Sequence, residues 1–144
     1  MNNLLNNEQI TILVNSCDKY EDAWEPFFKL FNINWPDCPY KVILNTEEKV
    51  YPCNFMNVET INYNKKSTWS QRLKHVLENI NSEYIIFFLE DFFLQSPVNV
   101  DGLKKAVTLM CTDDSVGYIG LKIIMKDIFI LSTIPIANSS NLLK

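Results

Sequence analysis

One stretch limits the possible folds of this chain more than any other, residues 84–94, which read Tyr-Ile-Ile-Phe-Phe-Leu-Glu-Asp-Phe-Phe-Leu. Its first six residues are apolar and rich in β-branched and aromatic types. Such an unbroken run is typical of a strand that is buried on both faces, as in parallel sheets. Because an unpaired carboxylate is too costly to bury inside such a strand, we expect Glu90 and Asp91 where the strand leaves the sheet, at its carboxyl end.

The acidic pair has two interpretations at that position. In open α/β sheets the carboxyl ends of the strands border the ligand site. Glu90 and Asp91 there are suited to a divalent cation, Mn²⁺ or Mg²⁺, that holds phosphate oxygens. Acids at strand ends also commonly cap the next helix or face water, and on these residues alone both interpretations stay open.

Composition narrows the class of protein. The chain has 144 residues, 47% of them hydrophobic and 21% charged, which fits one globular domain with a real core. Its net charge of −4 makes nucleic acid a poor partner. The amino terminus does not have the features of a signal peptide, and no run of about twenty apolar residues offers a membrane span. We therefore expect a cytoplasmic location.

The cysteines and the single histidine do not form a metal-binding pattern. No CxxC pair occurs among Cys17, Cys38, Cys53 and Cys111, and His75 is the only histidine. A zinc site is therefore not expected. In a cytoplasmic chain the cysteines are most simply free thiols, some of them in the core.

Strand and helix patterns alternate along the chain. Strands are predicted at residues 10–14, 40–45, 56–61, 84–89 and 116–121, and helices at 22–31, 69–79 and 99–110. This order predicts the α/β class, a Rossmann-like and mostly parallel sheet with helices on both faces. After Lys122 the pattern weakens. Residues 1–122 are thus expected to be one α/β domain, and residues 123–144 a carboxyl-terminal tail of uncertain structure.

The helix predicted at 69–79 carries two side chains of interest. An apolar stripe at helical spacing predicts that one face packs on the core: Trp69, Leu73, Val76, Leu77 and Ile80. Arg72 lies on the flank of this stripe, in the first turn, near the edge where ligands would arrive. It is a candidate ligand contact, with a salt bridge as the alternative. His75 lies on the polar face and is expected to be solvated.

Several familiar sites are absent from the sequence. No GxGxxG, GxxxxGK[ST] or GxSxG motif occurs, and a single His makes a Ser-His-Asp triad improbable. A polar loop follows the first strand instead. If the strand order reverses between the first and fourth strands, this loop and the acidic pair border one crevice. Ser16, Asp18 and Tyr20 could then bind a base or ribose, which outlines a nucleotide-sugar site.

Five stretches of the chain resemble a known family, the GT-A class of glycosyltransferases, in particular bacterial proteins of cell-surface polysaccharide synthesis. The likeness extends over about residues 10 to 121. The stretches that carry it are residues 14–20, 24–28, 35–40, 67–73 and 84–94.

This resemblance implies a function for the chain. In the class, a DxD-type acidic motif after the fourth strand binds Mn²⁺ or Mg²⁺ with the donor's diphosphate, and the matching place here is Glu90-Asp91. It also implies that Asp18 lies by the nucleotide base. Residues 1–122 would then be a nucleotide-sugar-binding domain for hexosyl transfer to a saccharide or lipid-linked acceptor. Peripheral association with the inner face of the membrane would follow.

The chain departs from the family in two places. Phe92 and Phe93 stand where a second spaced acid is expected, and the acceptor-binding half that usually supplies the catalytic base is not evident after Leu121, where Asp127 is the only acid. The catalytic residue therefore stays unassigned, and such a chain could bind a donor without transferring its sugar. Two alternatives remain: a non-catalytic binding or assembly module, and an unrelated α/β domain whose acids are structural.

Overall fold

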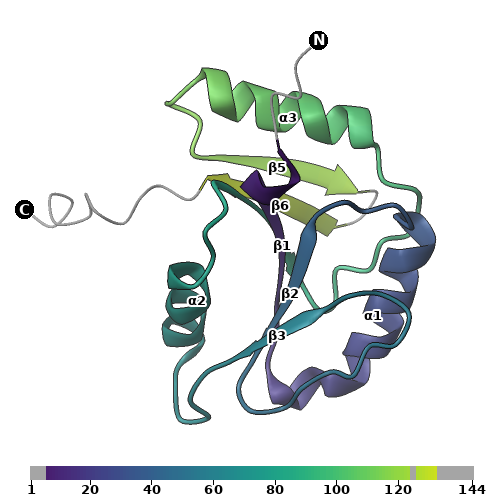
Figure 1. The fold of residues 1–144 in the computed structure, drawn as a ribbon, viewed down its shortest axis with the longest axis vertical. Coiled ribbons are helices and arrows are strands. Elements are labelled where there is room, and N and C mark those ends of the chain that lie inside the picture. The colour runs from purple at the N-terminus through teal and green to yellow at the C-terminus, as the bar shows by residue number, and fades with distance from the viewer. Residues whose placement is uncertain (1–5, 124–125, 133–144) are drawn as a thin grey trace, which may run out of the picture.

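A computed structural model describes residues 6–123 and 126–132 as one sheet with helices packed on it (Figure 1). Short 3-10 turns precede the first strand, at Asn7–Gln9, and the first helix, at Asp18–Tyr20. The longer elements are β1 (Ile10–Asn15), α1 (Glu21–Asn34), β2 (Lys41–Thr46), β3 (Glu59–Asn62), α2 (Trp69–Glu78), β4 (Tyr84–Leu89), α3 (Val100–Thr112), β5 (Tyr118–Ile123) and β6 (Lys126–Ser132).

The sheet has six strands in the order β3-β2-β1-β4-β6-β5. β1 lies between β2 and β4 and is parallel to both, and β3 is parallel to β2. Four parallel strands with helices between them confirm the predicted α/β class. The sequence argument for a shared crevice depended on a reversal of strand order, and this reversal is present, because β2 and β4 lie on opposite sides of β1.

The strand β6 is the main difference from the sequence prediction. It falls within residues 123–144, expected as a tail of uncertain structure, yet it pairs antiparallel with both β4 and β5. The predicted strand at 116–121 is observed as β5, which lies at the sheet edge with β6 between it and β4. The charged residues Lys126 and Asp127 weakened the strand pattern in the sequence. They are the first two residues of β6 and pair with Ile123 and Lys122, the last two residues of β5. The rest of the tail expected at 123–144, residues 133–144, lies outside the described residues.

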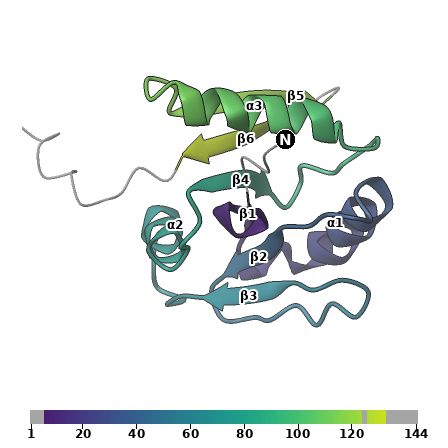
Figure 2. The same ribbon diagram turned by 45° about the horizontal axis from the view of Figure 1, so that its top comes forward.

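Helices cover both faces of the sheet, as predicted. On one face, Ile12 and Val14 of β1 pack with buried side chains of α1 and α3. On the other face, Leu13 of β1 packs with Val76 and Ile80, from α2 and the residues just after it. Figure 2 shows α2 on the opposite side of the sheet from α1. The alternation of neighbouring β1 residues between two cores follows from the period of a strand, whose successive side chains point to opposite faces.

β4 is the buried strand that the sequence predicts. Its side chains from Tyr84 to Phe88 are all buried, and Leu89 is half-buried. Phe88 makes edge contacts with Phe27 and Phe31 of α1, with ring centroids 5.7 and 6.0 Å apart. These contacts hold α1 over β1 and β4, next to the loops that follow both strands.

All four cysteines are free thiols, as expected. None of them is fully buried, so the expectation that some lie in the core is only partly met. Cys38 is half-buried and packs against the core, whereas Cys111 on α3 is exposed.

Candidate functional site

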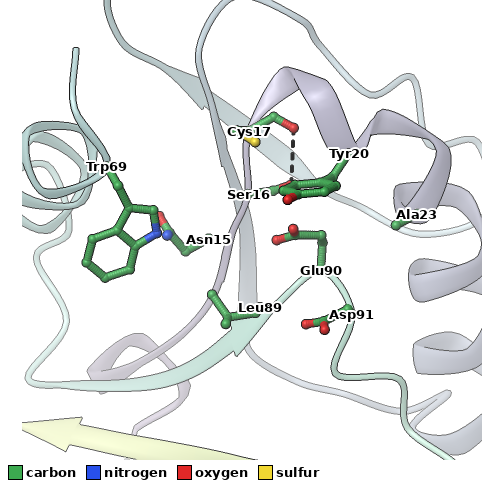
Figure 3. A pocket seen from close by; sticks show the side chains of 9 residues that line it. All are labelled: Asn15, Ser16, Cys17, Tyr20, Ala23, Trp69, Leu89, Glu90 and Asp91. Atoms are coloured by element: carbon green, nitrogen blue, oxygen red, sulfur yellow. Dashed lines mark hydrogen bonds between the residues drawn. The ribbon is translucent and has the colours of Figure 1, made fainter.

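A pocket of ≈ 380 Å³ opens at the carboxyl ends of β1 and β4, a volume within the usual range for small-molecule sites. Its lining comes from the end of β1 and the loop after it, from the start of α1, from the first residue of α2 and from the exit of β4 (Figure 3). The lining residues are Asn15, Ser16, Cys17, Tyr20, Ala23, Trp69, Leu89, Glu90 and Asp91.

The pocket contains four of the residues that the sequence singled out: Ser16, Tyr20, Glu90 and Asp91. In the register of the parallel pair β1–β4, Asn15 stands opposite Leu89, so both strands end at the same level. The β1 loop and the acidic pair therefore emerge side by side. This confirms that the two segments border one crevice, as the sequence predicts for neighbouring strands that leave the sheet at its carboxyl edge.

Glu90 is half-buried, and its protonation depends on its neighbours. Burial is the main cause that raises the pKa of its carboxyl group, and the negative charge of Asp91 raises it further. Hydrogen bonds from its own backbone and from the Ser16 hydroxyl act in the opposite direction. Ser16 is itself held in place, because it accepts a hydrogen bond of 2.8 Å from Nε1 of the buried Trp24. The Ser16 hydroxyl therefore offsets only part of the effect of burial, and the pKa of Glu90 stays raised.

Asp91 follows Glu90 at the exit of β4 and is exposed. In Figure 3 both carboxylates point to the same side of the chain, into the pocket. Two such acids suit Mg²⁺ or Mn²⁺, which take oxygen ligands and commonly combine one or two protein carboxylates with substrate phosphates. No group of three or more metal-ligating side chains occurs among the described residues. A cation here would therefore need ligands from its substrate or from water.

Two exposed aromatic side chains line the pocket. Tyr20, from the β1 loop, is 48% exposed and lies over Glu90, and Trp69 is 51% exposed on the opposite side (Figure 3). The prediction that Trp69 packs in the core is wrong. It is the first residue of α2 and lines the pocket together with Asn15 and Leu89, the last residues of β1 and β4. Val76 and Ile80, farther along the same stripe, are buried.

Asp18 does not line the pocket. Its carboxylate accepts hydrogen bonds of 3.2–3.3 Å from the backbone N–H groups of Glu47, Glu48 and Lys49, in the loop after β2. Its own backbone N–H donates to Oε2 of Glu47 at 2.5 Å. Asp18 therefore joins the β1 and β2 loops, and in this structure its carboxylate is directed at backbone groups of the protein.

Arg72 also lies outside the lining and is buried, with 7% exposure. Its Nη1 lies 3.1 Å from Oε1 of Glu47 and donates to the backbone oxygen of Ser67 at 3.0 Å. The salt bridge that the sequence left as the alternative is thus present. His75 is half-buried and not simply solvated, because its ring stacks on Tyr63 with centroids 4.2 Å apart.

The charged side chains of the pocket lining are all acidic. Two of its lining residues are acidic and none is Lys, Arg or His. Burial is also the main cause that raises the pKa of the Cys17 thiol, with the charges of Glu47 and Glu90 acting in the same direction. A cation is therefore favoured here, and an anionic group such as a diphosphate would require one as a bridge.

Five lining residues were not candidate site residues from the sequence: Asn15, Cys17, Ala23, Trp69 and Leu89. Asn15 and Cys17 flank Ser16 at the end of β1, so the same topological argument applies to them. For Trp69 the only available signal was its place at the start of a helix, just after the cap at Thr68.

Comparisons with known proteins do not identify the chain: no protein-family model and no curated protein matches it. Within residues 6–123 and 126–132, no helix has both the length and the apolar character needed to cross a membrane.

Proposed function

We propose that the chain is a GT-A-type glycosyltransferase domain that binds a nucleotide-sugar donor through a divalent metal, in the synthesis of cell-surface polysaccharide. One observation carries the proposal: Glu90 and Asp91, at the exit of β4, share a pocket with Ser16 and Tyr20 of the β1 loop. This is the place in an open α/β sheet where nucleotides bind.

The charge of the pocket supports a metal in this role. Without a basic residue in the lining, a diphosphate would meet only the repulsion of Glu90 and Asp91. Mn²⁺ or Mg²⁺ bound by these acids would neutralise both the protein and the phosphate oxygens, and would stabilise the charge that develops on the leaving diphosphate. The chain's own contribution is to hold the two carboxylates on one side of the pocket. A bound cation would favour the ionised form of Glu90, whose pKa is raised in its absence.

The rest of the donor has partners of suitable chemistry in the same pocket. The exposed ring of Tyr20 can stack on a nucleobase, and the Ser16 hydroxyl can exchange its present acceptors for a ribose hydroxyl. Asp18 and Arg72 act indirectly in this proposal, because they position the loops and not the ligand.

A second candidate is a non-catalytic binding module. One observation favours it: the pocket lining has no acid besides Glu90 and Asp91 and no histidine. If both carboxylates hold the metal, none of the lining residues remains to deprotonate an acceptor hydroxyl, a step that inverting sugar transfer requires.

The test is a titration of the purified chain with UDP-glucose and GDP-mannose, with Mn²⁺ or with EDTA. At a ligand concentration 100 times Kd, binding should raise the melting temperature by roughly 5–10 °C. The shift should require the metal and should be absent in Asp91→Ala, whereas Asp37→Asn, an exposed acid outside the pocket lining, should keep it. A shift that is indifferent to metal, or one that persists in Asp91→Ala, would contradict the proposal.

The same preparation separates the two candidates. Release of free hexose, or its transfer to an added saccharide acceptor, in the presence of Mn²⁺ and not of EDTA, supports the enzyme. Metal-dependent binding with neither reaction supports the binding module.

A further inference from the structure

The three tryptophans of the chain occupy very different environments. Trp24 and Trp35 are 3% and 5% exposed, whereas Trp69 is 51% exposed and lines the pocket. Leaving half an indole in water forgoes the large gain in free energy that its burial brings. An indole held at the wall of a pocket is suited to bury this surface against a ligand.

The backbone of Trp69 is fixed before any ligand arrives. Thr68 caps α2, its Oγ1 accepting a hydrogen bond from the N–H of Gln71, and the Gln71 side chain accepts from the N–H of Thr68 at 2.8 Å. Arg72, one turn along, donates to the oxygen of Ser67. The residues on both sides of Trp69 are thus held, which reduces the entropy lost when a ligand packs on its ring.

The surroundings of Trp69 combine an apolar surface with polar groups. Leu89 lines the same pocket, and Figure 3 shows the Asn15 amide beside the indole. Asn15 is 1% exposed and touches the pocket from the end of β1. Its Oδ1 accepts a hydrogen bond of 2.7 Å from Nδ2 of Asn45, so its NH₂ group is the part of the amide that could donate to a ligand at the pocket wall. A hexose ring matches this combination, because its C–H face is apolar and its rim carries hydroxyl groups.

We propose that Trp69 is the sugar-binding residue of the site and packs against the apolar face of the donor's hexose, with Asn15 donating to a ring hydroxyl. This inference rests on the proposed function and deepens it, by assigning the sugar to the side of the pocket opposite Tyr20. The base and the sugar lie at the two ends of the diphosphate in such a donor. Each ring would thus meet one of the two exposed aromatic side chains.

The experiment compares UDP-glucose with UDP, and GDP-mannose with GDP, by calorimetry in the presence of Mn²⁺. Truncating Trp69→Ala should weaken binding of the nucleotide sugars about three- to tenfold, the range expected for one ring contact, and leave UDP and GDP unchanged. Trp69→Phe, which keeps a ring, should restore most of the affinity. Ile33→Ala, at a site on α1 that is 70% exposed and outside the pocket lining, is the matched control.

Two results would overturn the inference. One is an equal loss for nucleotide and nucleotide sugar in Trp69→Ala, which would mean that the indole contacts the nucleotide or shapes the pocket. The other is unchanged affinity for both. Melting temperatures of all variants identify any general loss of folding.

A failure of the proposed function can be distinguished from a failure of this inference. If no nucleotide binds with or without metal, methyl glucoside and methyl mannoside are titrated into the chain, and the indole N–H signal of Trp69 is followed by NMR. A saturable shift of the Trp69 signal, with the signal of the buried Trp35 outside the pocket lining unchanged, supports the sugar site on its own. The absence of any shift rejects it.

Discussion

Arg72, which is buried, and Glu47, which is half-buried, form an ion pair, with Nη1 of Arg72 3.1 Å from Oε1 of Glu47 and side-chain exposures of 8% and 17%. Glu47 also accepts from the backbone of Asp18, and Arg72 donates to the backbone of Ser67. The pair therefore joins the loops after β1 and β2 to the start of α2. Because Tyr20 follows Asp18 by two residues and Trp69 follows Ser67 by two, it also holds the two aromatic walls of the pocket in place.

Breaking this ion pair should strongly destabilise the chain. Arg72→Met leaves the Glu47 carboxylate without its buried partner, and the free energy of unfolding should fall by about 3–5 kcal/mol. Urea denaturation followed by circular dichroism measures the change. The control is Glu25→Gln, which removes an exposed pair with Lys29 (60% and 58% exposed) and should change the stability by no more than about 0.5 kcal/mol. Equal effects of the two substitutions would contradict a special role for Arg72.

Asp18 should contribute to stability more than to ligand binding. Asp18→Ala removes the acceptor of three backbone N–H groups in the β2 loop and should lower the free energy of unfolding by about 1–3 kcal/mol. The nucleotide Kd of the folded variant should stay within about twofold of the original, since the carboxylate does not line the pocket. Calorimetry measures the Kd, and urea denaturation the stability. A large loss of affinity at unchanged stability would instead support the direct contact with the base that the sequence suggests.

The raised pKa of Glu90 predicts a pH-dependent loss of stability. The folded chain favours the protonated carboxyl relative to the unfolded chain, so the contribution of Glu90 is fully present below its usual pKa and is lost as the pH rises through the raised value. Replacing it by Glu90→Gln should therefore raise the melting temperature at pH 7. The gain should vanish near pH 4, where both states of the original are largely protonated. Melting curves from pH 4 to 8 test this, and a gain that does not depend on pH would show that the carboxyl charge is not its cause.

Ligand binding should protect Cys17 from alkylation. Cys17 lines the pocket and its pKa is raised mainly by burial, so we expect slow reaction with iodoacetamide at pH 8. Cys111 is exposed and should react first, whereas burial raises the pKa of Cys38 to about 11 and should leave it nearly inert. Addition of UDP-glucose and Mn²⁺ should slow the labelling of Cys17 alone, as measured by peptide mass spectrometry. Unchanged labelling of Cys17 under saturating ligand would place the nucleotide elsewhere.

Much of the architecture could be predicted because it depends on local patterns. The apolar runs of β1 and β4 are properties of consecutive residues. The positions of Ser16 and Glu90, just after the ends of these runs, follow from the same local pattern. β6 was missed because it is defined by pairing with β4 and β5, and its two opening residues are charged. The environment of Trp69 was missed for a related reason: helical spacing shows which side chains share a face, but not which of them lie over a pocket.

The sequence by itself determined the α/β class, the buried central strand and the placement of two acids and a polar loop at the ends of strands, because hydrophobic periodicity and the cost of burying charge act within a few residues. Only the tertiary structure decided that Asp18 and Arg72 serve the loops through Glu47 while Trp69 faces the pocket. These outcomes depend on which loops meet at the carboxyl edge of the sheet, and that is a property of strand order and register.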